Sequence, residues 1–68
     1  MSDGIRVVPK DKIWLVERGN YLLGEFKTTE QALQLARKRA KSSHSDVLLY
    51  GLNGEVIRRE TFETSPAA

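Results

Sequence analysis

The chain has 68 residues and no cysteine, and its 11 lysines and arginines outnumber its 9 acidic residues only slightly. A chain of this length forms one domain with a small core, and without cysteine it holds neither a disulfide nor a thiolate metal site. A net charge of +2 is low for a protein that binds nucleic acid, so such a function would depend on where the charges cluster.

The two ends of the chain carry no long apolar segment. Residues 1–4 lack the apolar run of a signal peptide, and no stretch approaches the about 20 apolar residues that a membrane helix needs. We expect residues 1–4 and 61–68 to be disordered around a single domain at residues 5–60. We also expect the protein to be cytoplasmic.

Three short runs in the first half of the chain are rich in β-branched and aromatic side chains, which is typical of strands. They cover residues 5–9 (IRVVP), 13–18 (IWLVER) and 21–26 (YLLGEF). Pro9 places its strand at a sheet edge or ends it, because proline cannot donate to a ladder. Gly24 indicates a bulge in the third run, and Gly19-Asn20 indicates the turn before it.

The segment 28–43 (TTEQALQLARKRAKSS) predicts a helix. Its apolar residues fall on one stripe at about 3.6 residues per turn, and no glycine or proline interrupts the run. Thr28 and Gln31 fit a capping box at its start. The stripe consists of Ala32, Leu33, Leu35, Ala36 and Ala40.

Two further strand-like runs follow the helix, at residues 47–52 (VLLYGL) and 55–60 (EVIRRE). Asn53-Gly54 between them favours a two-residue type I′ loop, since both loop positions need positive φ. Such a loop would pair Tyr50 with Ile57 on one face of the sheet. It would pair Leu49 with Arg58 on the other face.

The order β-β-β-α-β-β predicts an α+β fold, a small antiparallel sheet with one amphipathic helix packed on one face. Six short motifs are spread along the chain: Val7-Val8-Pro9, Trp14-x-Val16, Phe26-x-Thr28, Gln31-Ala32, Ala36-x-x-x-Ala40 and Asn53-Gly54-x-Val56. In this order and spacing they resemble the small bacterial family known as domain of unknown function 2188, over residues 5–57. Many members have histidine where this chain has Arg6 and Tyr50, and an acid in place of Gln31. The resemblance implies a small sheet-and-helix fold and no established activity.

Residues with catalytic chemistry do not cluster in the sequence. His44 is the only histidine and lies among serines, so a solvated loop residue explains it better than a metal ligand or a base. The acids are scattered, and the serines around His44 have no activating partner. We therefore expect no enzyme, no cofactor, no metal and no small-molecule substrate, and we assign no catalytic, cofactor-binding or metal-binding residue.

A basic cluster on the predicted helix is the first candidate functional feature, and it consists of Arg37, Lys38, Arg39 and Lys41. If it contacts phosphates, the protein is a small nucleic-acid-binding protein. The competing interpretation is a solvated outer face whose charges favour the C-terminal end of the helix. No aromatic residue lies within the cluster to stack on bases.

An excess of apolar residues on the strands is the second candidate feature. Side chains alternate between the faces of a sheet, and a single helix covers only one face. The sequence does not decide which face packs on the helix. Leu48, Tyr50 and Ile57 are candidates for an interface on the other face, which would make the protein a non-enzymatic interaction module that forms a homodimer or binds another protein. In the competing interpretation, sheet twist and long Arg or Lys stems shield that face within a monomer.

Overall fold

The computed structural model describes residues 4–62, so the expectations for residues 1–3 and 63–68 lie outside the described residues. Five strands and one helix follow in the predicted order. They are β1 (Ile5–Lys10), β2 (Ile13–Arg18), β3 (Tyr21–Phe26), α1 (Thr29–Ser43), β4 (Asp46–Tyr50) and β5 (Val56–Thr61). The α+β fold class is confirmed. The expected tail was placed from Thr61 onward, whereas the structure includes Thr61 in β5 and packs Phe62 against the core.

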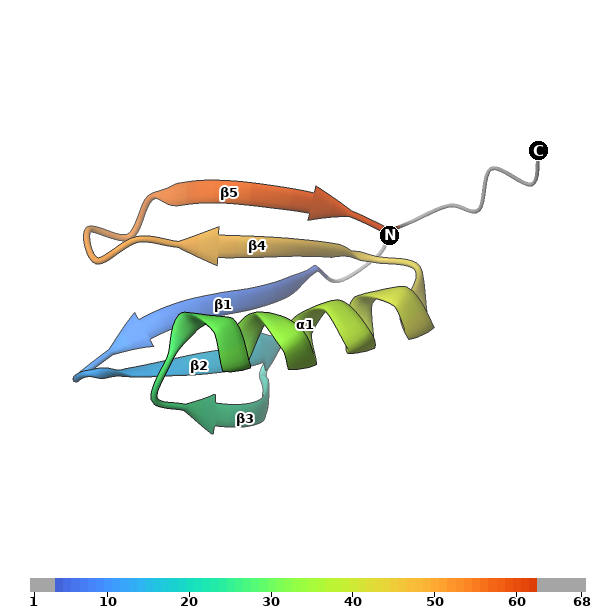
Figure 1. The fold of residues 1–68 in the computed structure, drawn as a ribbon. Coiled ribbons are helices and arrows are strands. Elements are labelled where there is room, and N and C mark those ends of the chain that lie inside the picture. The colour runs from blue at the N-terminus through green and yellow to red at the C-terminus, as the bar shows by residue number, and fades with distance from the viewer. Residues whose placement is uncertain (1–3, 63–68) are drawn as a thin grey trace.

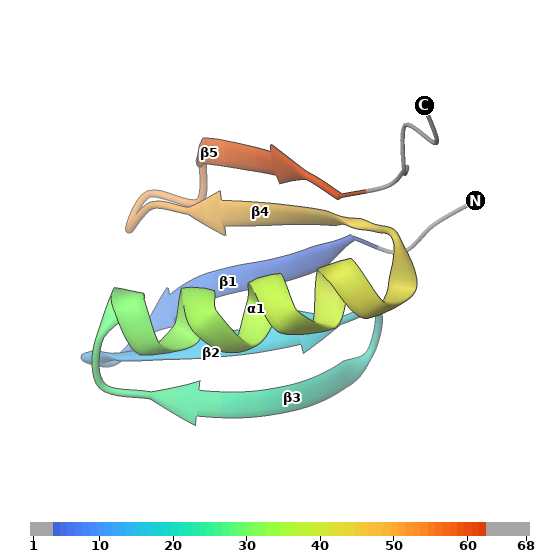
Figure 2. The same cartoon turned by 45° about the vertical axis from the view of Figure 1, so that its right-hand side comes forward.

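The strands form one sheet in the order β3-β2-β1-β4-β5, with α1 along one face (Figures 1 and 2). Neighbouring strands are antiparallel except β1 and β4, which run parallel. The sheet is therefore mixed, and the prediction of a wholly antiparallel sheet was wrong in this one pair. This arrangement follows from the helical connection. A tight turn can only reverse the chain, whereas α1 carries it from β3 at one edge back across the sheet to the free side of β1.

The core lies between α1 and the face of the sheet that carries the odd-numbered residues of β1. Ile5 and Val7 in β1 and Val16 in β2 are fully buried there, because alternate residues of a strand share one face. Val47 and Leu49 in β4 extend this layer. The helix contributes residues that are mostly small and let its backbone lie close to the sheet: Ala32, Leu33, Ala36 and Ala40.

The bulge predicted at Gly24 is confirmed in β3. Val16 pairs with Gly24 and Glu17 with Leu22, which leaves Leu23 as the extra residue. A Cβ atom on Gly24 would lie 3.0 Å from the Phe26 ring and 3.1 Å from a methyl group of Leu35 on the helix. Glycine at this position therefore allows α1 to pack closely over β3.

Capping explains where α1 begins and ends. The hydroxyl of Thr28 accepts a hydrogen bond from the Gln31 backbone N–H at 3.2 Å, which confirms Thr28 as the N-cap. At the other end, His44 adopts the left-handed conformation that glycine usually supplies (φ 54°, ψ 48°), and its N–H donates to the Ala40 carbonyl. His44 is exposed, and its backbone ends the helix.

The prediction of a two-residue loop at Asn53-Gly54 was wrong. Gly51 donates its N–H to the Glu55 carbonyl at 2.8 Å, and only Gly54 in this loop has positive φ (84°). The pattern is that of a three-residue loop closed by glycine, which displaces the register by one residue. Tyr50 therefore pairs with Val56 and not with Ile57. A register shift between Leu49 and Tyr50 then leaves Ile57 without a partner, so that Leu49 pairs with Arg58 as predicted.

The two-residue loop with positive φ at both positions instead joins β1 to β2. Asp11 (φ 50°) and Lys12 (φ 69°) occupy it, between the paired residues Lys10 and Ile13. Aspartate tolerates this conformation, whereas lysine rarely adopts it. The full register of β1 with β2 leaves only two residues for the connection, and this long-range pairing imposes the turn type.

Candidate interaction surfaces

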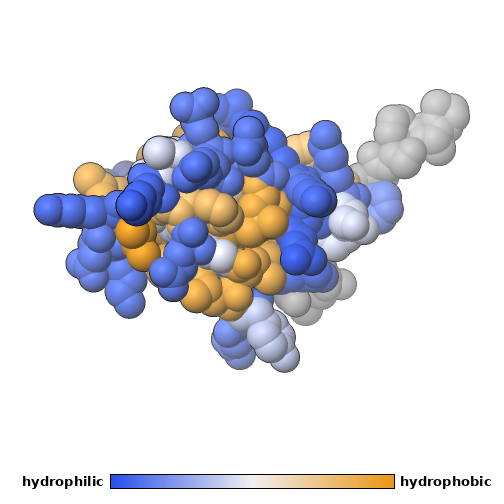
Figure 3. Space-filling view, turned by 60° about the horizontal axis from the view of Figure 1, so that its bottom comes forward, coloured by the Kyte–Doolittle hydropathy of each residue, from blue (hydrophilic) through white to orange (hydrophobic). Residues whose placement is uncertain are grey.

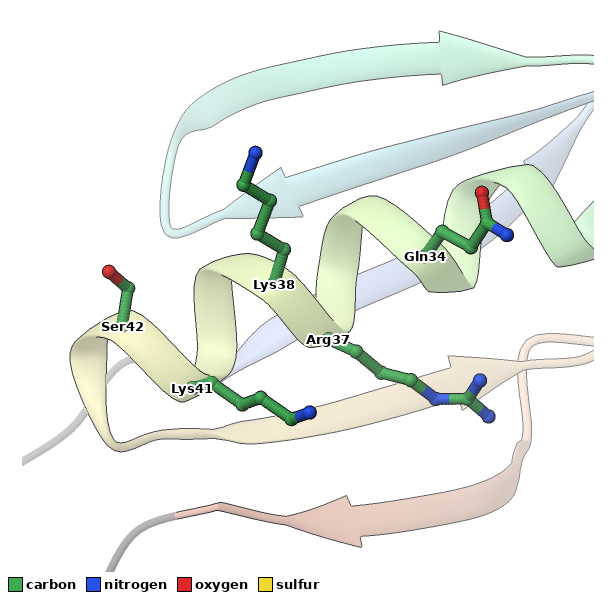
Figure 4. A pocket seen from close by; sticks show the side chains of 5 residues that line it. All are labelled: Gln34, Arg37, Lys38, Lys41 and Ser42. Atoms are coloured by element: carbon green, nitrogen blue, oxygen red, sulfur yellow. The ribbon is translucent and has the colours of Figure 1, made fainter.

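The side chains of the predicted basic cluster do not all point to the same side of α1. Figure 4 shows Arg37 and Lys41 directed toward β4 and β5, and Lys38 directed to the other side of the helix, toward β2 and β3. A shallow hollow of about 580 Å³ runs over the outer side of α1 between these side chains. Arg37 and Lys41 are four positions apart and share a side of the helix, whereas Lys38 follows Arg37 directly and is rotated by about 100° from it, as a period of about 3.6 residues requires.

Arg37 is engaged in an ion pair with the edge strand β5. Its Nε and Nη2 atoms donate to the two carboxylate oxygens of Glu60, both at 2.7 Å, and Arg58 Nε lies 3.1 Å from the same carboxylate. The hydrogen bond from Arg37 lowers the pKa of Glu60 below its ordinary value of 4.5, against the opposing effect of burial. It also raises the pKa of Arg37. The Arg37 charge is therefore compensated within the protein.

We expect this ion pair to make stability depend on pH through Glu60. Because Arg37 favours the carboxylate form, the unfolded chain binds a proton at Glu60 more readily than the folded protein does. The stabilisation is fully present above the ordinary pKa of 4.5 and is lost as the pH falls through the lowered pKa of the folded state. Urea unfolding of wild type and Glu60→Gln should differ by about 1 kcal/mol at neutral pH, a value reduced for the exposure of Arg37. The difference should vanish in strong acid, and a constant difference at all pH values would contradict this account.

The other three cations of the cluster also differ in what they contact. Lys41 Nζ lies 5.8 Å from the centre of the Phe62 ring, on the β5 side. Lys38 and Arg39 are exposed and form no salt bridge within residues 4–62. The sequence signal could not separate these residues, because the partner Glu60 lies 23 positions from Arg37.

The second face of the sheet carries no helix. We call it the open face. On β1 it carries Val8, since Val7 beside it faces α1, and on β4 it carries Leu48 and Tyr50 between the buried Val47 and Leu49. Figures 1 and 2 show no helix or strand layer on this side of the part of the chain that the structure describes.

Apolar side chains cross the open face from strand to strand. Leu15 of β2 pairs with Val8, Tyr50 neighbours Val8 on the other side, and Tyr50 pairs with Val56. Val56 and Ile57 are 49% and 62% exposed. The predicted interface residues Leu48 and Tyr50 thus lie on one uncovered face, whereas Ile57 has no partner in the register and the pairing assigns it to neither face. Sequence reasoning did not assign Val8 and Leu15 to this interface, although the alternation along their strands indicates their side.

Ion pairs occupy one end of the open face. Arg6 lies 3.2 Å from Glu17 and donates to the Gly19 carbonyl at 2.9 Å. Arg59 Nη2 lies 2.6 Å from the carboxylate of Asp46. Long polar side chains thus cover the end of this face near the start of β1. The row through Leu15, Val8 and Tyr50 lies beyond them, toward the other end of the strands.

No three His, Asp or Glu side chains in residues 4–62 are grouped so that they could hold a metal ion. The one helix of this region is too short and too polar to cross a membrane.

The fold and its surfaces define a two-layer α+β domain, one mixed sheet and one helix, with one sheet face open. The chain belongs to the bacterial family described as "uncharacterized protein conserved in bacteria (DUF2188)", whose sequence model matches residues 5–62. This confirms the resemblance seen in the motifs and extends it beyond Ile57. A search of the curated proteins and a search of the solved structures gave no significant match.

Proposed function

We propose that the protein is a non-enzymatic interaction module that associates through the open face, with a second copy of itself as the partner. The observation that carries the proposal is the apolar row of Leu15, Val8, Tyr50 and Val56 on a face without a covering layer. Apolar surface of this kind, bordered by polar residues, usually marks an interface.

The charges around the row favour a second copy. The open face carries Arg6 and Arg59 together with Glu17 and Asp46. In a two-fold dimer the same surface meets itself, so a border that contains both signs can place opposite charges against each other. A border of one sign would repel its copy.

A specific dimer would have to bury a minimum area of the open face. Specific interfaces begin at about 1,200 Å² in total, or about 600 Å² from each subunit. At about 25 cal/mol per Å², burial of that area on each subunit contributes about 15 kcal/mol per subunit before the cost of association is subtracted. Two sheets that pack face to face through such rows lie about 10 Å apart, as in a sandwich.

Sedimentation equilibrium tests the proposal with two matched tyrosine substitutions. We expect wild type to be dimeric at about 100 micromolar, a concentration above the micromolar-to-picomolar Kd range of interfaces of standard size. Tyr50→Lys should be a folded monomer, because it places a charge in the row. Tyr21→Lys is the control, since Tyr21 lies 76% exposed on the helix-side face of β3 and should leave the dimer intact.

Two results would refute the proposal. The first is a wild-type monomer at that concentration. The second is a dimer that Tyr50→Lys leaves intact, because the association would then use another surface. Far-UV circular dichroism of both variants establishes that they are folded.

Nucleic-acid binding through residues 37–41 stays a second prediction, with less support. Arg37 is bound to Glu60 and Lys41 lies over Phe62, so two of its four cations are engaged within the protein. A phosphate-binding surface requires charges that are free to displace counterions. The two remaining cations, Lys38 and Arg39, line the hollow beside Leu35.

A further inference from the structure

Two hollows lie on the side of α1 away from β5, one of about 680 Å³ at the β2–β3 turn and one of about 240 Å³ along the helix. We call the two hollows together the α1–β3 groove. Leu23 lines the first and Leu35 the second. Leu35 packs over Gly24, the neighbour of Leu23, so the two hollows adjoin the same short stretch of β3.

The floor of this α1–β3 groove is aliphatic and its borders are basic. Leu23 and Leu35 are only partly buried, although they pack against the core. Seen from the β3 side, apolar surface is enclosed by hydrophilic side chains (Figure 3). Arg18 borders the groove at the turn, and Lys38 and Arg39 border it on the helix.

The arginines at this groove differ from the others in residues 4–62, because Arg6, Arg37, Arg58 and Arg59 all have an acidic partner. Arg18, Lys38 and Arg39 form no salt bridge within residues 4–62, whereas Arg37 and Arg58, on the β5 side, both contact Glu60. The protein therefore presents apolar surface together with uncompensated positive charge at one place. A complementary ligand carries apolar side chains and carboxylates.

We propose that the α1–β3 groove binds an acidic, apolar peptide segment of a partner protein. Leucine-like side chains of the segment would rest on Leu23 and Leu35, and its carboxylates would face Arg18, Lys38 and Arg39. The aliphatic floor distinguishes this ligand from single-stranded nucleic acid, whose bases need aromatic side chains to stack on. Tyr21 is the one aromatic residue that lines either hollow.

The groove is separate from the open face. Tyr21 pairs with Arg18, whose other partner Ile5 is buried under α1, so the groove lies on the helix side of the sheet. Peptide binding at the groove and association through the open face can therefore succeed or fail independently.

Selection from a displayed library of random peptides tests the proposal. Peptides of about ten residues suffice, because in extended form they span the roughly 22 Å length of α1. The folded wild-type protein is immobilised, and selected peptides are measured by fluorescence anisotropy in solution. We expect the selected pool to be enriched in Asp and Glu combined with Leu, Ile or Phe.

Two double variants on the same helix provide the discriminating comparison. Lys38→Gln with Arg39→Gln should weaken binding about tenfold, since both remove charge from the groove. Arg37→Gln with Lys41→Gln removes equal charge on the β5 side and should change binding less than about twofold. Circular dichroism verifies that both variants keep their helix.

Three outcomes would overturn the proposal. The first is a pool of selected peptides without an excess of Asp and Glu. The second is an equal loss of binding in both double variants, which would indicate a general charge effect. The third is tighter binding of a labelled oligothymidine of about ten nucleotides than of the selected peptides, with loss in the groove variant, which would make nucleic acid the occupant.

Discussion

Replacing Val7 with aspartate should unfold the domain, whereas the same replacement at Val8 should leave it folded. Val7 is fully buried between β1 and α1, in contact with the core residues of both layers. An aspartate there buries a carboxylate without a partner, which costs more than about 4 kcal/mol. A domain of 68 residues has only about 3–5 kcal/mol of stability to lose.

Val8 is the same residue type as Val7 and follows it in β1, but it lies on the opposite face of the sheet. It is half-buried on the open face, where an aspartate keeps contact with water. We expect Val8→Asp to lower the free energy of unfolding by about 1 kcal/mol in the monomer and to abolish self-association. Urea unfolding and sedimentation of both variants measure these effects. If Val8→Asp also unfolded the chain, the open face would have to be covered within the monomer.

Replacing Phe26 with alanine is the second change with a large expected effect. Phe26 pairs with Trp14 across β2 and β3. Its ring is so close to Gly24 that a Cβ atom there would lie 3.0 Å from it. Both aromatic side chains are only half-buried, so we expect a loss of about 2–4 kcal/mol, at or below the usual range for a buried phenylalanine. Loss of this size should shift the midpoint of urea unfolding markedly, with an unchanged slope.

Tyr21→Ala provides the control for Phe26→Ala. Tyr21 is an aromatic residue of the same strand and is 76% exposed, so its truncation should cost less than about 0.5 kcal/mol. Equal losses for the two variants would contradict the assignment of Phe26 to the core edge.

The features predicted correctly from the sequence depend on local patterns. The start of α1 follows from the Thr28 side chain and the helical spacing of small apolar residues, and the structure differs by one residue. The two apolar faces of the strands follow from alternation, which is equally local. The expectation that Leu48 and Tyr50 share an uncovered face therefore agrees with the structure.

The features that were missed depend on contacts between distant segments. Asn53-Gly54 permits a type I′ turn, but the register of β4 with β5 selects a longer loop. Asp11-Lys12 has little turn preference of this kind, and the pairing of β1 with β2 imposes it. Arg37 belongs to a basic run in the sequence, and only the fold brings Glu60 to it.

The division of the helix into two sides has the same cause. Arg37 and Lys41 lie on the β5 side, where Glu60 and Phe62 engage them, and Lys38 lies on the β3 side. A run of charges in a sequence does not show which of them the fold will compensate. The topology of the sheet decides this, because it determines which strand lies beside each side of the helix.

The most direct test of the open face as the interface is an isotope-filtered NOE experiment on a mixed sample of labelled and unlabelled wild-type protein. It detects only contacts between subunits. We expect intermolecular NOEs between the Tyr50 ring and the methyl groups of Val8 and Leu15, which lie in the apolar row. Intermolecular NOEs that arise only from α1, or none from a sample at about millimolar concentration, would contradict the proposed association.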